Sequence, residues 1–325
     1  MYIFRKCKKR KKAFALISTL VLISILSMMA LEFSQRSRIN LTMSVNYSDS
    51  KKALYYAYGG YQAALSLLKK DTNDFDGPGD FWYGMLPPIP IGEGFVTVDI
   101  SDEKARFNVR KMVTARGKMD KRRTVMCERI FRALAIEPSL VYGIVDWQDT
   151  DDLIEQDGAE FSYYSLLTPP YEPRNGQLVT SGEILLIKGF DRDLFFIPPA
   201  SRSPIALEEF AALDNYITVY GDGKININTA GVPVLLSLSK DMDEYIAQDI
   251  MEFKEKTVFE NIEDLKKVKS VSDILYNEIR SLITVKSDLF RITARGISGN
   301  FYQVVTAVVL KESKGFRVVY YNRSL

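Results

Sequence analysis

The chain has 325 residues, with 43 Lys and Arg against 41 Asp and Glu and a formal net charge of +2. Seven of the basic residues lie within the first 13 positions, and without these positions 36 basic residues would face 41 acidic ones. Such a mildly acidic remainder is unfavourable for nucleic-acid binding through counterion release. The chain has no histidine, which excludes His-ligated zinc and Ser-His-Asp or Cys-His catalysis. Any metal would then be held by oxygen ligands, which favours calcium or magnesium.

The N-terminus joins a basic cluster, residues 5–12, to an uncharged run, residues 13–31. As a helix this run would be about 28 Å long, close to the hydrocarbon thickness of a bilayer. The basic cluster would stay cytoplasmic and the remaining chain would lie across the membrane. Three interpretations stay open. They are a cleaved secretory signal, for which residues 27–32 are a poor exit sequence, an uncleaved signal anchor, and a prepilin signal cut between Ala13 and Phe14.

The first predicted element is a long helix. No proline precedes Pro78, so one helix is predicted from Phe14 to about Lys70. Apolar residues in its second half form a stripe suited to packing on a sheet, and Gly59–Gly60 is a candidate bend. Residues 76–90 are rich in glycine and proline and are predicted to be loop.

Strand patterns flank a mainly helical middle, residues 111–281. The predicted strands are residues 95–100 and 106–109 before it, and 289–296, 302–310 and 316–321 after it. One sheet interrupted by an insertion explains this order most simply. We therefore expect an α+β fold, in which a long N-terminal transmembrane helix packs on an antiparallel sheet that carries a large inserted all-α domain.

The helical middle contains an acidic segment, with seven carboxylates between Asp146 and Glu160. Such a cluster repels itself, and a hard divalent cation is the usual physical remedy. A solvated acidic turn is the alternative. Trp147 and Tyr164 favour the metal site, because they would place the acids in a partly buried loop where bare charges are costly. The segment is not an EF-hand, since Leu153 stands at the next ligand position.

Residues 224–230, Lys-Ile-Asn-Ile-Asn-Thr-Ala, resemble the opening of a helix-hairpin-helix domain. Thr229 is expected to cap the following helix, and Asn226 and Asn228 to tie down the loop before it. DNA-binding hairpins offer backbone amides to phosphate at a glycine turn. Residues 238–244 have no glycine and three acids at that turn, so the scaffold is expected without DNA binding.

Taken together, three segments resemble the minor pseudopilin K family of type II secretion systems, and they span essentially the whole chain. They are the basic leader with Ala13–Phe14 and Ser18, the acidic stretch Asp146–Asp152 continued by Gly158–Glu160, Tyr164, Pro173–Gly176 and Ser181–Ile184, and the Asn-rich motif at 224–230. The resemblance implies a pilin-like fold with a SAM-like or helix-hairpin-helix-like insertion. The expected domains are the leader 1–13, the helix and first strands 14–110, the insertion 111–285 with subdomains 111–205 and 222–285, and the C-terminal strands 286–325.

The resemblance also implies roles for particular residues. A prepilin peptidase would cut after Ala13 and methylate the new N-terminus at Phe14. Most pilins have Glu where this chain has Ser18, and a subunit without that Glu can occupy the fibre tip. The family binds calcium in its inserted domain, so structural calcium is the expected cofactor. The candidate calcium ligands are Asp149, Asp151, Asp152 and Glu160.

The function implied is not enzymatic: a minor pseudopilin at the tip of the type II secretion pseudopilus, which initiates assembly and supports protein export across the outer membrane. The expected partners are the minor pseudopilins I and J, the major pseudopilin and the prepilin peptidase, with the secretin and the secreted cargo as further candidates and no nucleic acid. The expected location is the inner membrane, with a single pass and the bulk of the chain in the periplasm.

The sequence leaves two alternatives to this function open. One is a membrane-anchored periplasmic helix-hairpin-helix protein of a type IV pilus or DNA-uptake apparatus, which the negative remainder and the missing glycines disfavour. The other is a membrane-anchored hydrolase that uses paired carboxylates. For the hydrolase the acidic segment is the only candidate site, and the sequence supplies neither a substrate cleft nor a nucleophile.

Overall fold

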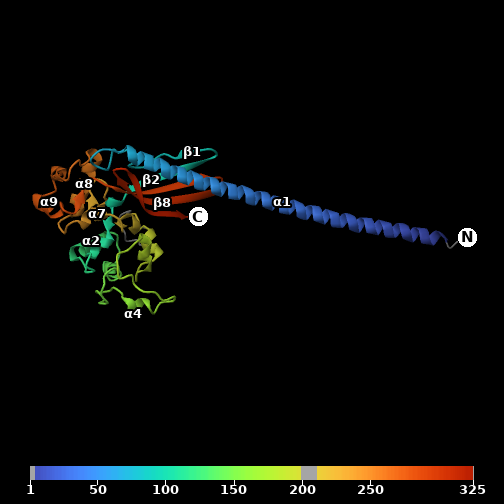
Figure 1. Ribbon diagram of the computed structural model, residues 1–325, viewed down its shortest axis with the longest axis horizontal. Helices are drawn as coiled ribbons and strands as arrows, with labels where there is room; N and C mark the ends of the chain where they lie inside the picture. Colours follow the sequence, from blue (N-terminus) through green and yellow to red (C-terminus); the bar gives the residue numbers. More distant parts are fainter. Residues whose placement is uncertain (1–3, 199–210, 325) are drawn as a thin grey trace.

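A single long helix, α1 (Phe4–Lys70), carries the rest of the molecule at one end (Figure 1). The computed structural model describes residues 4–198 and 211–324, and for 4–13 and 324 it describes the backbone alone. The predicted end of the helix at Lys70 is confirmed, and the helix begins at Phe4, inside the predicted leader. Residues 1–3 of that leader, the predicted subdomain end at residue 205 and Leu325 lie outside the described residues.

The sheet is antiparallel throughout, with its strands in the spatial order β1-β2-β7-β8-β9. The three strands predicted after the helical middle are confirmed, and so is the strand at 95–100. The segment predicted as loop up to residue 90 instead runs into an edge strand, β1, that pairs with β2. The strand bounds are β1 Ile89–Ile91, β2 Gly94–Asp102, β7 Leu289–Ser298, β8 Phe301–Glu312 and β9 Gly315–Ser324.

The C-terminal third of α1 packs on this sheet through small residues. A Cβ added to Gly60 would lie 2.5 Å from the Cγ2 of Val96 on β2. From the other side, a Cβ on Gly296 of β7 would collide with the backbone of Ala53 and Ala57. The helix continues through Gly59–Gly60, so Gly60 serves the close approach of helix to sheet, while Gly59 faces open space.

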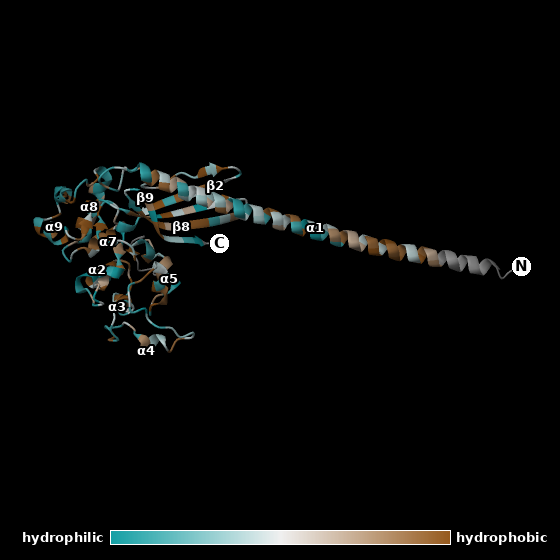
Figure 2. Cartoon of the chain, in the orientation of Figure 1, coloured by the Kyte–Doolittle hydropathy of each residue, from teal (hydrophilic) through white to brown (hydrophobic). Residues whose placement is uncertain are grey.

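The rest of α1 leaves the body of the molecule. Every described side chain from residue 14 to residue 48 is exposed. The apolar part of this stretch stands out in Figure 2, and by length and composition the helix could cross a membrane. A large exposed apolar surface of this kind marks a membrane or protein contact.

Between β2 and β7 the chain forms an inserted region, residues 103–288, at the end of the molecule opposite the N-terminus (Figure 1). The strand predicted at 106–109 is wrong for the main sheet, because β3 (Phe107–Asn108) pairs in parallel with β4 (Ile217–Thr218) inside the inserted region. A second parallel pair joins β5 (Ile225–Asn226) to β6 (Ile283–Thr284).

Short helices make up most of the regular structure of the inserted region. The α-helices are α2 Lys121–Ala133, α3 Leu140–Asp146, α4 Phe161–Tyr164, α5 Arg192–Phe196, α7 Val232–Ser237, α8 Glu244–Lys256 and α9 Asp273–Ile279. The 3-10 helices are η1 Glu103–Ala105, η2 Val109–Met112, η3 Ser181–Leu186, η4 Leu213–Asn215 and η5 Ile262–Lys267. One apolar core runs through the region, with Phe107, Phe131, Ile144 and Leu235 among its members, and it extends to Leu289 and Val308 of the sheet.

Candidate functional site

Three acids of the acidic segment converge between the end of α3 and the start of α4. Asp146 is the last residue of α3, and Glu160 immediately precedes α4. Together with Asp149 they can place one carboxylate oxygen each within 4.8 Å of one another. All three are buried, at 0%, 4% and 2% exposure for Asp146, Asp149 and Glu160. Because like charges are brought together out of water, this group needs a compensating partner.

Aromatic packing and one glycine hold the loop in place. The rings of Trp147 and Tyr164 meet edge to face, 5.2 Å between centroids, and both are buried. The Tyr164 hydroxyl accepts a hydrogen bond of 3.2 Å from the backbone N–H of Lys188. A Cβ on Gly158 would collide with the Asp146 carboxylate, so the loop can close over that acid only with glycine at this position.

The electrostatics of the group are those of an unneutralised site. Burial, and then the neighbouring carboxylates, raises the pKa of Asp149 to about 7 and that of Glu160 to about 8. Burial likewise raises the pKa of Asp146 to about 7, against the backbone N–H of Glu155, which donates to its oxygens at 3.3 Å. Oδ1 of Asp149 and both oxygens of Glu160 have no hydrogen-bond partner among the described residues. Buried, unpartnered carboxylate oxygens suit a hard cation, so this donor set fits calcium.

Two of the four predicted calcium ligands lie in the buried group and two are exposed. Asp149 and Glu160 belong to the buried group, whereas Asp151 is exposed and accepts from the N–H of Leu153 at 3.0 Å. Asp152 is also exposed and lines, with Glu160, an open cavity of about 300 Å³. Asp146 was not among the predicted ligands. Its signal in the sequence is an acid that ends an otherwise apolar helix, where a surface acid would not be expected.

The N-terminal positions lie on the free part of α1. The predicted cleavage bond, Ala13–Phe14, falls within the helix, and the Phe14 side chain is 75% exposed. The Ser18 hydroxyl donates to the Phe14 carbonyl at 2.9 Å, inside its own helix. Residues 13–31 contain no carboxylate, so this segment offers no acid to a neighbouring chain.

The Asn-rich motif ties the inserted region together, as predicted for Asn226 and Asn228. Asn228 exchanges two hydrogen bonds of 2.9 Å with the backbone of Phe259, and Asn226 donates to the Asp102 carboxylate at 2.9 Å. The predicted cap at Thr229 is wrong: α7 begins after Gly231. The Thr229 hydroxyl instead donates to Asp102 Oδ2 at 2.6 Å, because that buried acid, brought in from the end of β2, is the stronger acceptor.

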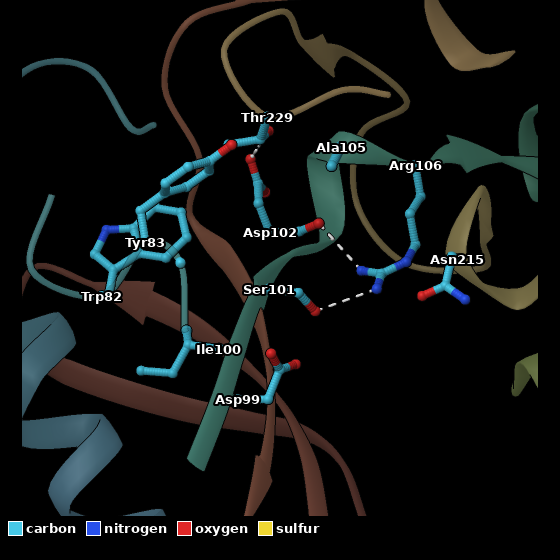
Figure 3. A pocket seen from close by; sticks show the side chains of 11 residues that line it. Trp82, Tyr83, Asp99, Ile100, Ser101, Asp102, Ala105, Arg106, Asn215 and Thr229 are labelled. Carbon is cyan, nitrogen blue, oxygen red and sulfur yellow. Dashed lines mark hydrogen bonds between the residues drawn. The ribbon is translucent and has the colours of Figure 1, made fainter. Parts of the chain in front are cut away.

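Figure 3 shows the junction where this acid lies, around a cavity of about 180 Å³ between the sheet and the inserted region. Arg106 donates to the Asp102 carbonyl at 3.1 Å and to the Ser101 hydroxyl at 3.2 Å. Burial raises the pKa of Asp102, and the hydrogen bonds it accepts from Ser287 and Thr229 oppose that rise. These contacts fasten the inserted region to the end of β2.

At the helix-hairpin-helix turn, an acidic side chain of the protein occupies the helix N-terminus at which DNA-binding hairpins hold a phosphate. The Asp243 side chain caps α8 by accepting from the N–H of Ile246 at 2.8 Å. Asp241 and Glu244 flank it in the sequence. A phosphate would meet both an occupied helix N-terminus and negative charge there.

The long free helix, the antiparallel sheet and the inserted helical region define a pilin-like subunit with a helix-hairpin-helix insertion. A sequence model described as "Type II secretion system (T2SS), protein K" matches residues 105–196, and one described as "Helix-hairpin-helix motif" matches residues 221–284. These matches make the chain similar to protein K of the type II secretion system over the first half of its inserted region.

Two relatives and one solved structure are similar to the chain. The chain is 25% identical over 274 residues to type II secretion system protein K of Pseudomonas aeruginosa, covering 80% of this chain and 77% of the relative. It is 26% identical over 203 residues to the protein K of Aeromonas hydrophila, covering 58% of this chain and 61% of the relative. In fold it is similar to a chain of the GspK-GspI-GspJ complex of enterotoxigenic Escherichia coli, with a TM-score of 0.68 and 15% identity over 87% of this chain and 99% of the other.

Proposed function

We propose that this chain is the minor pseudopilin at the tip of a type II secretion pseudopilus, where it initiates assembly and supports protein export. One observation carries the proposal: the inserted region lies at the end of the molecule opposite the apolar N-terminal segment (Figure 1). In a fibre of parallel helices, that end is where the next subunit would stack. A bulky insertion there leaves no room for a subunit above it.

The free part of α1 supports the same placement. Its exposed apolar side chains suit either lipid or the neighbouring helices of a fibre, so the helix can pass from one to the other during assembly. Ser18 uses its hydroxyl within its own helix and offers no carboxylate to a subunit above. The helix would anchor the chain in the inner membrane with its body in the periplasm, after a prepilin peptidase has cut at Ala13–Phe14 and methylated Phe14.

We further propose that the chain assembles with minor pseudopilins I and J, since the similar solved chain is part of a GspK-GspI-GspJ complex. The major pseudopilin would follow below this tip complex. The three acids at the helix-hairpin-helix turn, Asp241, Asp243 and Glu244, make a nucleic-acid partner unfavourable. A gel-shift assay with the detergent-solubilised chain tests that point, and a retarded DNA band at physiological salt would favour the DNA-uptake alternative.

Immunogold labelling of assembled fibres tests the tip position. We expect one label at one end of each fibre, and labels along the shaft would contradict the proposal. Ser18→Glu restores the acid found in most pilins, and Ser24→Glu is its control in the same apolar segment. Because the inserted region still covers the distal end, label from any Ser18→Glu chain that assembles should remain terminal.

We also propose that Asp146, Asp149 and Glu160 hold a structural calcium ion in the inserted region. The ion would supply the positive charge that their unpartnered oxygens lack. At calcium 100-fold above its dissociation constant, binding stabilises by about 2.7 kcal/mol, which is roughly 5–10 °C in Tm for a body of this size.

Double replacement separates the buried group from the exposed acids. Asp149→Asn with Glu160→Gln should lower the calcium-dependent rise in Tm by the contribution of this site, whereas Asp151→Asn should leave the rise unchanged. The measurement is thermal unfolding of the detergent-solubilised full chain in calcium and in chelator. A rise that is undiminished in the double variant but smaller in Asp151→Asn would assign the ligands to the exposed part of the loop.

A further inference from the structure

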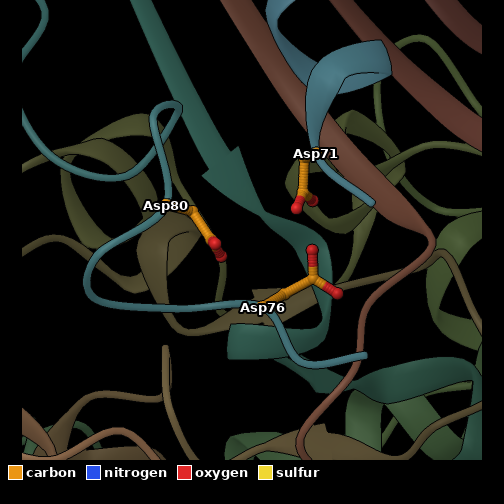
Figure 4. Close-up of side chains that lie close together, drawn as sticks. All are labelled: Asp71, Asp76 and Asp80. Atoms are coloured by element: carbon orange, nitrogen blue, oxygen red, sulfur yellow. The ribbon is translucent and has the colours of Figure 1, made fainter. Parts of the chain in front are cut away.

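A second group of acids lies where α1 ends, outside the inserted region. Asp71 is the first residue after the helix, and Asp76 and Asp80 follow in the loop that leads to the sheet. The three can place one carboxylate oxygen each within 4.8 Å of one another. Figure 4 shows their side chains turned toward a common space.

Asp76 is the member whose burial is paired with an unsatisfied carboxylate oxygen. Its side chain is buried, with 1% exposure. Oδ2 accepts from the N–H of Ser287 at 2.7 Å, while Oδ1 has no hydrogen-bond partner among the described residues. One oxygen of Asp76 points toward Asp71 in Figure 4, and the other points toward the chain segment that enters β7. A buried carboxylate oxygen that faces other acids is a costly arrangement without a cation.

The other two acids are held in place by the protein. Asp80 accepts from the side-chain amide of Asn73 at 2.6 Å and from the N–H of Gly77 at 2.8 Å. Asp71 pairs with Lys311 of β8, Nζ to Oδ2, at 3.1 Å. Among the described residues, the only ion pair of this group is the one that Lys311 makes with Asp71. Oδ1 of Asn73 is also buried without a partner, which adds a neutral oxygen to the same loop.

We propose that Asp71, Asp76 and Asp80 form a binding site for a hard divalent cation of the size of calcium. Calcium binds oxygen ligands at about 2.3–2.6 Å, so two ligands on one ion lie up to about 5 Å apart. The separations in this group meet that limit. Carboxylate and amide oxygens in an irregular loop suit calcium better than magnesium, which needs near-ideal octahedral geometry. The site is independent of the proposed tip function.

Such an ion would join three parts of the molecule. Asp71 continues α1, and the backbone N–H of Asp76 donates to the Val285 carbonyl at 2.8 Å, just before β7. The same loop touches the helix-hairpin-helix motif, since a Cβ on Gly77 would lie 2.5 Å from the Cβ of Asn228. The cation would thus lock the anchoring helix to the point where the inserted region returns to the sheet.

The competing explanation is a proton shared between Asp71 and Asp76. Asp76→Asn distinguishes the two, because an amide can donate the hydrogen bond that a shared proton would supply but is a poorer cation ligand. A metal site predicts lost binding in this variant. A proton-sharing pair predicts that the variant is at least as stable as the parent in chelator, with no metal effect in either.

The experiment uses the detergent-solubilised full chain with Asp149→Asn and Glu160→Gln already in place, so that the other acidic group cannot contribute. We expect this parent to bind one further calcium ion in equilibrium dialysis and to gain Tm in calcium. Adding Asp76→Asn should remove both effects. Adding Asp74→Asn should keep both, since that aspartate of the same loop is fully exposed and pairs with Lys286. No bound calcium in the parent, where the loop is unaltered, would overturn the proposal even if Asp76→Asn failed to fold.

Terbium luminescence gives a second measurement that does not depend on folding stability. Trp82 lies two residues after Asp80 and is buried, and Trp147 lies between Asp146 and Asp149. In the parent variant, tryptophan-sensitised terbium emission should therefore come through Trp82 and should fall in Trp82→Phe while persisting in Trp147→Phe. Emission that follows Trp147 instead would place the ion at the other acidic group and contradict the proposal.

Discussion

The two parts of α1 belong to one helix but differ in the exposure of their side chains. From residue 14 to residue 48 every side chain is exposed, whereas beyond residue 49 Ala53, Ala57 and Ala64 are buried against the sheet. Large apolar residues fill the free part, and small residues govern the packed part. The free part therefore presents an apolar surface suited to a partner outside the molecule, while the packed part fits its sheet at the level of single atoms.

The packed part should be most sensitive at Gly296. In Gly296→Ala the new methyl group would collide with the backbone of Ala53 and Ala57, which neither side chain motion nor a rotamer change relieves. We expect a loss of about 3 kcal/mol or more in the free energy of unfolding, measured by denaturant unfolding of the solubilised chain. Unchanged stability would mean that helix and sheet are less closely packed than described.

The free part should respond in the opposite way. Leu26→Asp places a charge near the middle of the apolar segment and should oppose membrane insertion by about 3 kcal/mol. The free energy of unfolding of the body should stay within about 0.5 kcal/mol of that of the unaltered chain, because Leu26 is exposed on the free part of α1. Membrane fractionation and denaturant unfolding measure the two effects. A destabilised body would show that the two parts are not independent.

Lys254 supplies a test that touches neither part of α1. It is buried and donates to the Ala230 carbonyl at 2.7 Å, and burial lowers its pKa to about 8. Since the folded pKa lies below the unfolded one, stability should rise by about 2 kcal/mol between pH 8 and pH 10.5. Lys254→Met should lack this rise in denaturant unfolding at the two pH values. A rise of equal size in the variant would assign the effect to another group.

The smallest expected changes in stability are those of alanine substitutions at two neighbouring glycines of the packed part. Gly60→Ala should cost about 1–2 kcal/mol, because its Cβ would press on Val96. Gly59→Ala should stabilise by about 0.5–1 kcal/mol, because its site is open and alanine favours the helix. Thermal unfolding of both variants gives the comparison. Effects of the same sign would contradict the orientation of the helix on the sheet.

Local patterns were sufficient for much of this fold. Alternating residues predicted the strands β7 to β9, and the absence of proline before Pro78 predicted one uninterrupted helix up to Lys70. Local patterns could not predict which strands pair across long sequence separations. Residues 106–109 have a strand pattern, yet Phe107–Asn108 finds its partner in Ile217–Thr218 rather than in the main sheet.

The sequence predicted a cluster of acids in this segment, but it predicted only two of the three acids that converge. Asp149 and Glu160 converge with Asp146, whereas Asp151 and Asp152 face outward. Composition indicates that acids gather, but which of them turn inward depends on where α3 ends. Thr229 gives the same lesson, because its hydroxyl is drawn to an acid 127 positions away rather than to its own helix.

The place where the inserted region leaves and rejoins the sheet has a consequence for how this architecture can change. Asp102, the last residue of β2, lies directly opposite Phe290 on β7. The two ends of residues 103–288 therefore meet at adjacent positions of one strand pair, where a short hairpin turn would fit. Closing a loop costs free energy that grows only slowly with its length. A segment there can be enlarged, trimmed or exchanged while the strand register on either side stays the same.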